Sequence, residues 1–381
     1  MRRRSLGKTG LEVSAIGFGG FPLRNVPKAQ ASEALNHALN LGVNFVDTAR
    51  EYGDSEEKIG QVLTNRRDDC LIATKTNRVD ARGAWRDLRT SLKALRTDRI
   101  DLYQLHGPIL NEHDGYRRAL GPGGALGALK RAKRKGIVDH IGIALHWALD
   151  LMIEALRSGE FETIMVSYSA IDQEGVGKDV LPLAMERGLG VIVMKPLMEG
   201  DLTIPGSSGG NLAGFHGLPG RRVLKGDPLV ATGLKFTLSN PAVSTVIPGM
   251  ISIDEVEQNV RAGGITSTIS DQEKRWLYET LGGLGRRFNP FGQVCLHCEL
   301  CFPCPEGIDI IGAYRAAEMR AAPRPYFPAS LRTLSVQLYR SLERKPSSCN
   351  RCGDCVPRCP AKLPIPDQLA HIANLFERRR E

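Results

Sequence analysis

Four polar side chains stand beside short apolar runs in the first third of the chain. Asp47, Lys75 and His106 each end a run that is expected to form a strand, and Tyr52 follows Asp47 by five residues in a turn closed by glycine. Side chains at the ends of neighbouring parallel strands come together at one rim of a barrel. A carboxylate, a phenol, an amine and an imidazole that meet in this way can move protons. The sequence therefore predicts a catalytic site from these four residues.

Cysteines form a second group of residues able to do chemistry. Of nine, only Cys70 lies in the first 294 residues. The other eight form two motifs with a spacing typical of ferredoxin-type [4Fe–4S] ligation: Cys295, Cys298, Cys301 and Cys304, and Cys349, Cys352, Cys355 and Cys359. Zinc is the alternative, but structural zinc usually takes two pairs separated by a longer loop and does not need a third cysteine at this spacing. Disulfides are disfavoured because a cytoplasmic chain is expected.

The elements that must position the first site alternate between strands and helices. The strands are continuous apolar runs, which are typical of parallel strands buried on both faces. We expect them at residues 15–19, 43–46, 71–74, 102–105, 140–144, 163–167, 190–194 and 243–247. Eight β–α steps predict a (β/α)8 barrel. A doubly wound open sheet is the alternative, but the first strand is not followed by the Gly-x-Gly-x-x-Gly spacing.

Two further segments flank this barrel. Residues 4–13 are expected to form a β-hairpin. Ser270 and Glu273 form a capping box that opens a helix to about Leu281, and the glycines of 282–285 indicate a hinge. The predicted fold class is therefore α/β, a TIM barrel at 1–285 followed by a small, mainly helical iron–sulfur domain at 286–381.

The motifs around the four residues resemble those of the aldo/keto reductase superfamily. The matching stretches are Phe45-Val46-Asp47-Thr48-Ala49, Glu51-Tyr52-Gly53, Ala73-Thr74-Lys75 and Tyr103-Gln104-Leu105-His106, together with the opening Leu6-Gly7-Lys8-Thr9-Gly10 and Ile16-Gly17-Phe18-Gly19. They occur in the same order and the resemblance covers roughly residues 1–285.

The resemblance implies a role for each of the four residues, and the chemistry of carbonyl reduction explains the residue types. A free tyrosine with a pKa near 10 is a weak acid unless its phenolate is stabilised. A neighbouring ammonium provides that stabilisation, and a carboxylate keeps the ammonium charged. Tyr52 is then the proton donor, Lys75 modifies its pKa, Asp47 is the partner of Lys75, and His106 orients the carbonyl.

The cofactor that this resemblance implies is NAD(P)H, bound without a Rossmann fold. Backbone N–H groups at 248–250 and at the following helix N-terminus are expected to meet its phosphates. The residues expected to contact it are Ser167, Tyr168, Lys195, Pro248, Gly249, Met250, Gln258 and Asn259. Packing is the alternative for Tyr168. Glu255 stands where NADPH-specific relatives carry basic residues, which favours NADH or dual use.

The cysteine segment resembles two-cluster ferredoxins, in which the fourth cysteine of each motif ligates the other cluster. This implies that Cys359 completes the cluster of the first motif and that Cys304 completes that of the second. A subset of the aldo/keto reductase superfamily carries such an extension, and the chain resembles that subset over its full length. The prediction is two [4Fe–4S] clusters.

Composition limits the classes of protein that remain. The chain has 381 residues, 42% hydrophobic and 24% charged, which is ordinary for a soluble protein. It has no apolar run long enough for a membrane span and no secretory signal, so we expect a cytoplasmic protein. Its net charge of +9 is spread over helical faces and termini without a nucleic-acid motif, which favours a solvated surface over nucleic-acid binding.

The predicted function is NAD(P)H-dependent reduction of a small-molecule carbonyl, or oxidation of the alcohol. The alternatives are an iron–sulfur electron-transfer protein whose barrel mainly binds nucleotide, and a nucleotide-sensing barrel. A cluster passes one electron whereas NAD(P)H passes a hydride, and no flavin fingerprint is present to mediate. The clusters are therefore expected to stabilise the fold, to serve a redox partner protein or to act on a substrate directly.

Overall fold

The computed structural model describes residues 1–146, 148–170, 176–197, 228–265, 267–285, 295, 301–321, 329–359 and 362–377. Within these ranges the chain divides into two compact units, and the division falls between Ile269 and Ser270. The sequence places the domain boundary at residue 285 instead, and that boundary stays a prediction. By its contacts, the helix between the two positions belongs with the second unit.

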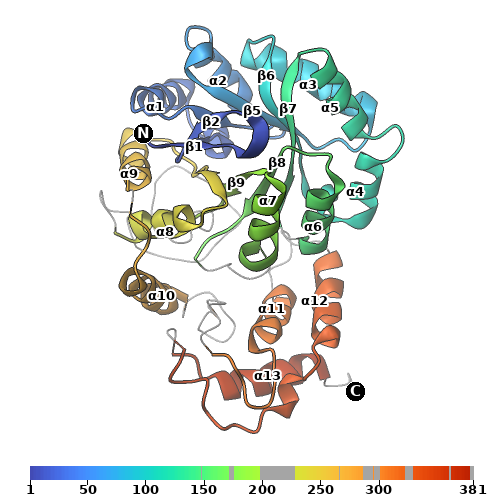
Figure 1. The fold of residues 1–381 in the computed structure, drawn as a ribbon, viewed down its shortest axis with the longest axis vertical. Helices are drawn as coiled ribbons and strands as arrows, with labels where there is room; N and C mark the ends of the chain where they lie inside the picture. The colour runs from blue at the N-terminus through green and yellow to red at the C-terminus, as the bar shows by residue number, and fades with distance from the viewer. Residues whose placement is uncertain are drawn as a thin grey trace. The chain divides into compact units, whose positions relative to one another are not determined.

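The first unit is a barrel of eight parallel strands with helices outside it (Figure 1). Each strand pairs with the next in chain order: β3 (Phe18–Gly19), β4 (Phe45–Asp47), β5 (Leu71–Thr76), β6 (Ile100–Leu105), β7 (Val138–Leu145), β8 (Thr163–Ser167), β9 (Gly190–Met194) and β10 (Val243–Val246). The ring closes because Gly17 N–H donates to Val246 O at 2.8 Å and Val246 N–H donates to Ala15 O at 3.0 Å. The predicted (β/α)8 class is confirmed.

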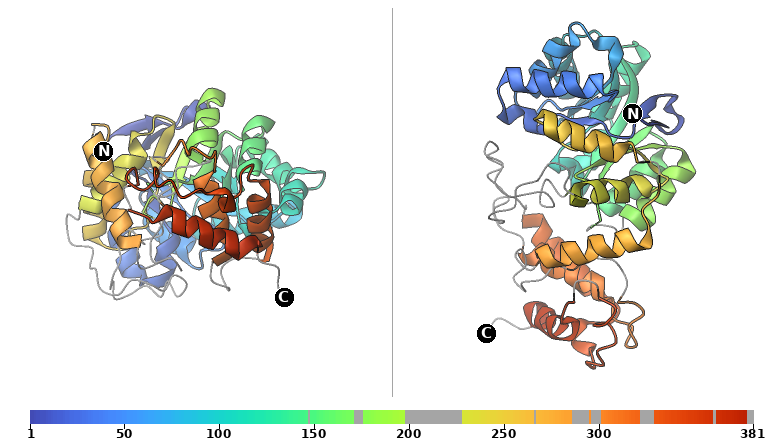
Figure 2. Two further views of the ribbon diagram at one scale, coloured as in Figure 1. Left: turned by 90° about the horizontal axis from the view of Figure 1, so that it is seen from below. Right: turned by 90° about the vertical axis from the view of Figure 1, so that its left-hand side faces the viewer.

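Helices cover the outer face of these strands, as the views in Figures 1 and 2 show. They are α1 (Lys28–Asn40), α2 (Ser55–Leu63), α3 (Ala81–Leu95), α4 (His113–Leu120), α5 (Ala125–Arg134), α6 (Leu149–Ser158), α7 (Leu181–Arg187), α8 (Pro228–Ser239) and α9 (Ile253–Gly263). The sequence pattern does not indicate α4. This helix is short and polar, and tertiary packing of Tyr116 and Ala119 stabilises it in place of local propensity.

Apolar side chains fill the interior of the barrel. They come from most of the strands and from the N-terminal segment: Leu6, Val13, Phe45, Ala73, Leu102, Ala144, Met165, Ile192, Met194 and Ile247. A barrel of eight strands is wide enough for such side chains and leaves no pore. The interior is therefore a packed core that holds the strand ends in place.

The predicted N-terminal hairpin forms between β1 (Arg3–Ser5) and β2 (Glu12–Ser14), and it closes the amino end of the barrel. Leu6 packs directly on Gly190, the first residue of β9. A Cβ at Gly190 would lie 2.7 Å from Leu6 Cδ1, so only glycine allows this close approach.

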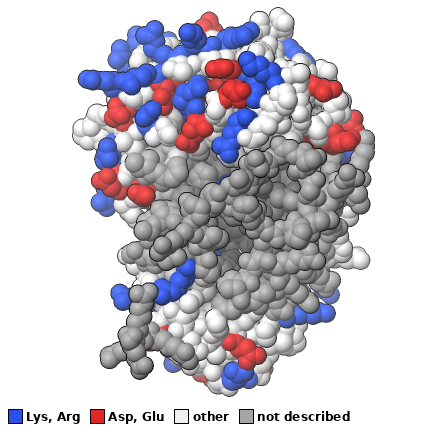
Figure 3. All heavy atoms as spheres, turned by 180° about the vertical axis from the view of Figure 1, so that it is seen from behind, with Lys and Arg blue, Asp and Glu red and all other residues white. Residues whose placement is uncertain are grey.

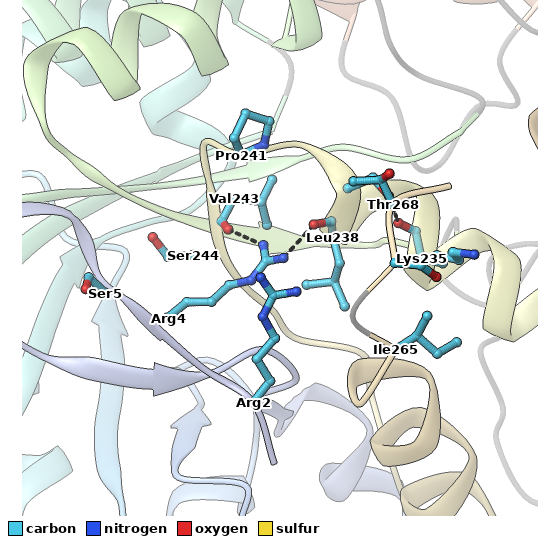
Figure 4. Close-up of a pocket in the computed structure, with 12 residues that line it drawn as sticks. Arg2, Arg4, Ser5, Lys235, Leu238, Pro241, Val243, Ser244, Ile265 and Thr268 are labelled. Carbon is cyan, nitrogen blue, oxygen red and sulfur yellow. Dashed lines mark hydrogen bonds between the residues drawn. The ribbon is translucent and has the colours of Figure 1, made fainter. Parts of the chain in front are cut away.

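Arg4 ties the hairpin to the rest of the barrel. Its guanidinium donates to Val243 O and Leu238 O, each at 2.7 Å, on one side of a cavity of about 500 Å³ (Figure 4). Leu238 lies in the last turn of α8, where carbonyls have no partner within the helix. Arg4 therefore donates hydrogen bonds to a carbonyl at the end of α8 and to a carbonyl at the start of β10.

The second unit is mainly helical, in agreement with the predicted fold class. It contains α10 (Asp271–Gly285), α11 (Ile310–Ala321), α12 (Ala329–Ser341) and α13 (Ile365–Glu377). Helices α11 and α13 pack side by side (Figure 2), and the buried hydroxyl of Tyr314 donates to Gln368 across them. Buried Ile311 and Leu369 add an apolar core to this contact.

Helix α10 begins as the sequence predicts. Glu273 N–H donates to Ser270 Oγ at 3.2 Å, and Ser270 N–H donates to Glu273 Oε2 at 2.8 Å. This reciprocal pair is the predicted capping box. The helix then continues through Gly282–Gly285, so the hinge expected at these glycines is helical.

Charged side chains of both signs are interspersed over the part of the first unit visible in Figure 3. Within the described ranges, every helix is too short or too polar to span a bilayer. The absence of nucleic-acid binding stays a prediction.

Glu162 joins three elements on the way into β8. Its carboxylate lies 2.7 Å from His140 Nδ1, accepts from Lys133 Nζ at 2.6 Å and accepts from Ile141 N–H at 3.1 Å. Burial raises the pKa of Glu162, but these hydrogen bonds outweigh burial and lower it to about 2. The ionised carboxylate therefore stabilises the folded barrel.

We expect Glu162→Gln to lower the free energy of unfolding by about 1–3 kcal/mol near neutral pH, as for hydrogen bonds to a charged group. The folded pKa lies below the ordinary value of 4.5, so this stabilisation is present above pH 4.5 and is lost as the pH falls towards 2. Urea unfolding of both proteins across this range should show the difference shrinking with acidity. A difference that stays constant or grows would contradict the assignment.

Candidate functional site

A buried ion pair lies at the centre of the site. Lys75 Nζ, from β5, donates to Asp47 Oδ2 at 2.6 Å and to Thr48 O at 2.8 Å. Lys75 is fully buried and Asp47 is 2% exposed. The pair forms because β4 and β5 are parallel neighbours that place these side chains at the carboxyl end of the barrel.

Tyr52 lies against this ion pair. Lys75 Nζ sits over the Tyr52 ring, 5.0 Å from its centroid. The turn that delivers Tyr52 is held by its own N–H, which donates to Ala49 O at 3.1 Å, and Phe21 meets the ring edge-on at 5.0 Å between centroids. The phenol and the ammonium therefore face one region, as the sequence predicts.

Beneath the site, Glu56 of α2 aligns the strands that carry it. It is fully buried, accepts from Thr74 Oγ1 at 2.6 Å and forms an ion pair with Arg50. Thr74 precedes Lys75, and Arg50 lies two residues before Tyr52. Glu56 therefore fixes the backbones on both sides of the amine–phenol contact.

His106 completes the group at the end of β6. Its ring meets the Tyr52 ring edge-on, with centroids 5.9 Å apart. Its Nδ1 lies 2.8 Å from Glu51 Oε1, and its ring lies 5.7 Å from that of His146. All four predicted side chains are therefore brought together, while their catalytic roles stay a prediction.

The sequence did not identify three residues that touch this group. They are Glu51 beside His106, Asn77, whose Nδ2 donates to Glu51 Oε2 at 2.9 Å, and Gln104, whose Nε2 donates to Asp47 Oδ1 at 3.4 Å. Glu51 and Gln104 lie inside the stretches that match the aldo/keto reductase motifs, so the sequence shows both residues but not what they contact. Their partners come from other strands, and no sequence spacing indicates them.

Protonation in the site is set by burial and by the ion pair. Burial lowers the pKa of Lys75, but Asp47 and Tyr52 raise it by more, so Lys75 is an ammonium at neutral pH. Burial also raises the pKa of Tyr52, by more than the Lys75 ammonium lowers it. Tyr52 is therefore a protonated phenol at neutral pH, and the expected effect of Lys75 works against burial.

The residues predicted to contact the nicotinamide differ in their surroundings. Lys195 follows β9 and acts electrostatically on His146, whose pKa is held well below 6.5 by burial and by this cation. Ser167 pairs with Met194 in the sheet. Tyr168 is buried with its ring 5.8 Å from that of Phe236 in α8, which is a packing contact. The part of Tyr168 in cofactor binding stays a prediction.

The segment predicted to meet phosphate leads into α9. Ser252 caps this helix by accepting from Glu255 N–H at 3.3 Å, and Glu255 Oε2 accepts from Ile251 N–H at 2.8 Å. The carboxylate of Glu255 therefore already occupies one amide near the helix N-terminus.

The other residues assigned to this segment lie around the same turn. Gly19 N–H donates to Pro248 O at 3.0 Å, and a Cβ at Gly249 would lie 2.8 Å from Pro22 Cγ. Met250 is fully buried and Asn259 is 5% exposed, so their side chains pack inside the unit. Gln258 lies one residue before Asn259 on α9.

The cysteine motifs lie next to each other within the second unit. Arg358 Nη1, beside Cys359, donates to Phe302 O at 3.1 Å and to Pro303 O at 3.3 Å, between Cys301 and Cys304. Asn350 Nδ2 donates to Glu306 Oε1 at 2.7 Å. The end of each motif is thus brought to the other one.

Four cysteines of the second unit interact with one another electrostatically. Burial raises the pKa of the Cys355 thiol, and nearby Cys349, Cys304 and Cys352 act on it electrostatically. These are the four cysteines that the crossed assignment groups together. Among the described residues, no group of three His, Cys, Asp or Glu side chains is placed to hold one metal ion. Cys298 lies outside the described residues.

Comparisons with known proteins agree with both halves of the chain. Residues 15–215 match the aldo/keto reductase family, and residues 294–364 match a 4Fe-4S dicluster domain. The uncharacterized oxidoreductase YqkF of Bacillus subtilis is 29% identical over 72% of this chain and 95% of its own. L-Galactose dehydrogenase of Arabidopsis thaliana is 30% identical over 68% of this chain and 87% of its own.

A solved structure shows the same barrel. Aldo-keto reductase AKR11C1 from Bacillus halodurans, in its holo form, is 28% identical, with a TM-score of 0.58 over 73% of this chain and 95% of its own. The chain therefore belongs to the aldo/keto reductase family and carries a C-terminal 4Fe-4S domain. It is an oxidoreductase of the NAD(P)-dependent type.

We expect Asp47→Asn to destabilise the barrel because it leaves the Lys75 ammonium buried without a counter-ion. Breaking a buried pair in this way costs about 3–5 kcal/mol. The matched control is Asp114→Asn, which removes a carboxylate that is 83% exposed and pairs with Arg118 across one helical turn; its effect should stay below about 1 kcal/mol. Urea unfolding followed by circular dichroism measures both, and equal effects would contradict the buried pair.

Proposed function

We propose that the chain reduces a small-molecule carbonyl, or oxidises the corresponding alcohol, with Tyr52 as general acid and base. The observation that carries the proposal is the buried Lys75 ammonium held between Asp47 and the Tyr52 ring. L-Galactose dehydrogenase, a relative named as the dehydrogenase of a sugar, supports a small-molecule substrate. The catalytic unit is residues 1–285.

Tyr52 supplies the proton that carbonyl reduction needs. A bound nicotinamide cofactor would supply the hydride in its reduced form, and its oxidised form would accept one in the reverse reaction. The Tyr52 hydroxyl transfers its proton to the developing alkoxide, and the Lys75 ammonium stabilises the phenolate that remains. Asp47 and Thr48 O keep that ammonium in place, so no reorganisation is needed during the transfer.

His106 and the strand ends orient the substrate and the cofactor. His106 lies beside Tyr52 and is 4% exposed, which suits a group that hydrogen-bonds the carbonyl oxygen. Ser167, Tyr168 and Lys195 are assigned to the nicotinamide side. Pro248, Gly249 and Met250 are assigned to the phosphates, and Gln258 and Asn259 to the adenine. Because Glu255 accepts from the Ile251 amide there, we infer NADH or dual use.

The second unit, residues 286–381 by the sequence boundary, holds two [4Fe–4S] clusters in this proposal. Cys295, Cys298, Cys301 and Cys359 ligate one, and Cys304, Cys349, Cys352 and Cys355 ligate the other. Cys352 is exposed, which brings its cluster near the surface of the unit. A one-electron partner protein is therefore a better match to the clusters than the hydride-transferring nicotinamide.

We expect Tyr52→Phe to lower kcat at least about a hundredfold, the size of a general-acid contribution. A panel of aldehydes and ketones with NADH and with NADPH measures turnover, and nucleotide fluorescence checks that cofactor binding survives. Tyr103→Phe is the control, since its hydroxyl is directed to Ala84 O at 3.4 Å, outside the site. Turnover untouched by Tyr52→Phe would refute the proton-donor role.

Iron content tests the clusters and their crossed ligands. Anaerobically purified protein should contain about eight iron atoms, and Cys304→Ser or Cys349→Ser about four. If both cysteines bind one cluster, the double variant also keeps about four. If each motif binds its own cluster, the double variant loses nearly all of its iron. Cys70→Ser, in a buried position of the barrel, is the control and should keep the full content.

A further inference from the structure

The cavity of about 500 Å³ beside Arg4 lies at the amino end of the barrel, opposite the rim that carries Tyr52 (Figure 4). Its walls come from the segment around β1, the end of α8, the start of β10 and the segment after α9, all within the first unit. Among the described residues that line it, none is assigned to catalysis or to the nicotinamide cofactor. A cavity of this size can enclose a small organic molecule.

Two arginines reach this cavity from the N-terminal strand. Alternate residues of a strand point to opposite faces, so Arg2 and Arg4 share one face and Arg3 lies on the other. Arg3 interacts there with the carboxylate of Glu12, which is not among the residues that line the cavity. The backbone of Arg2 is held because Ala15 N–H donates to Arg2 O at 2.9 Å. The hairpin therefore presents two cations to the cavity.

The charge on the cavity wall is positive. Its described lining includes Arg2, Arg4 and Lys235 and contains no Asp or Glu. Figure 4 shows the two guanidiniums directed into the same part of the cavity. They are close enough that Arg2 lowers the pKa of Arg4, in addition to the larger effect of burial. Because like charges repel, an anion between the two guanidiniums stabilises both.

The carbonyls in the cavity wall do not cancel this preference for an anion. Leu238 O and Val243 O would repel a negative ligand, but Arg4 donates to each of them at 2.7 Å. These bonds fix the Arg4 guanidinium in one orientation, so less freedom is lost when a ligand binds. A guanidinium has more N–H groups than these bonds use, so Arg4 can still donate to a ligand.

Charge and size together favour one class of anion, a phosphate monoester. Guanidiniums bind phosphate through pairs of parallel N–H···O bonds. A phosphate monoester is largely a dianion at neutral pH, so it balances both Arg2 and Arg4, whereas a single carboxylate balances one of them. The wall also contains the polar residues Ser267 and Thr268 and the exposed apolar side chain of Ile265. These surroundings suit a small polyhydroxylated body attached to the phosphate.

We propose that this cavity is a non-catalytic binding site for the phosphate monoester of a small polyhydroxylated molecule, with the phosphate between Arg2 and Arg4. The bound ligand joins the N-terminal hairpin to the segment after α9 and stabilises the folded first unit. The inference does not depend on the proposed function, because the cavity lies at the end of the barrel away from Tyr52.

Calorimetric titration of the whole, anaerobically purified protein tests the site. The probe is sorbitol 6-phosphate, which has no carbonyl to reduce, and NADH is present to fill the predicted nucleotide site. Arg2→Gln should weaken binding about tenfold or more, as expected for the loss of a hydrogen bond between charged groups. The matched control is Arg3→Gln, which removes the same charge from the other face of the strand and should leave binding unchanged.

Two further probes test the class of ligand. Inorganic phosphate fills only part of the cavity and gluconate carries a single negative charge, so both should bind more weakly than sorbitol 6-phosphate. Equal binding of inorganic phosphate contradicts the organic body, and equal binding of gluconate contradicts the phosphate. If sorbitol 6-phosphate does not bind, or if Arg2→Gln and Arg3→Gln weaken its binding equally, the proposal is overturned.

Thermal unfolding provides a second measurement. Sorbitol 6-phosphate should raise the unfolding temperature of the wild type and of Arg3→Gln, but not that of Arg2→Gln. An equal rise in all three proteins places the ligand elsewhere and overturns the proposal. If Arg2→Gln does not fold, a crystal structure of the wild type with sorbitol 6-phosphate decides, and a phosphate bound away from Arg2 and Arg4 refutes the site.

Discussion

The site depends on one interaction, the buried ion pair between Lys75 and Asp47. A fully buried ammonium is stable only with a partner of opposite charge and further acceptors, and Asp47 Oδ2 and Thr48 O provide them. The closed barrel makes the pair possible because it brings neighbouring strand ends to one rim. The packed interior and the Glu56 network then keep those ends from moving. The Tyr52 phenol obtains its chemistry from lying against this ammonium.

The second unit follows a different constraint. Its core is small, and two cysteine motifs far apart in the chain are brought to each other by Arg358 and Asn350. Ligand bonds to clusters would add stability that a small apolar core does not supply. The exposed Cys352 places one end of that arrangement within reach of another molecule. The chain therefore joins an aldo/keto reductase domain to a 4Fe-4S domain.

Much of this arrangement could be predicted from the sequence because its signals are local. Each strand is a continuous apolar run, so the barrel, its order and the convergence of Asp47, Tyr52, Lys75 and His106 follow from position alone. Each cysteine spacing is equally local. What the sequence did not reveal depends on contacts between distant segments. Glu51 meets His106 from the turn after β4, and Tyr168 packs on Phe236 of α8.

Helix propensity read from the sequence also gives the wrong structure at two places where tertiary packing determines whether a helix forms. Helix α4 is short and polar, and the glycines at the end of α10 continue a helix that their composition would end. Burial changed the electrostatics as well. It raises the pKa of Tyr52 further than Lys75 lowers it, which the order of residues does not show.

The most direct test of the central claim is the pH dependence of kcat for alcohol oxidation in the wild type and in Lys75→Met. Oxidation needs Tyr52 as a phenolate, so kcat should rise with pH through its pKa. Without the ammonium, that rise should move to higher pH by about one unit or more. A rise at the same pH in both proteins would show that Lys75 does not control the phenol, and the account would be wrong.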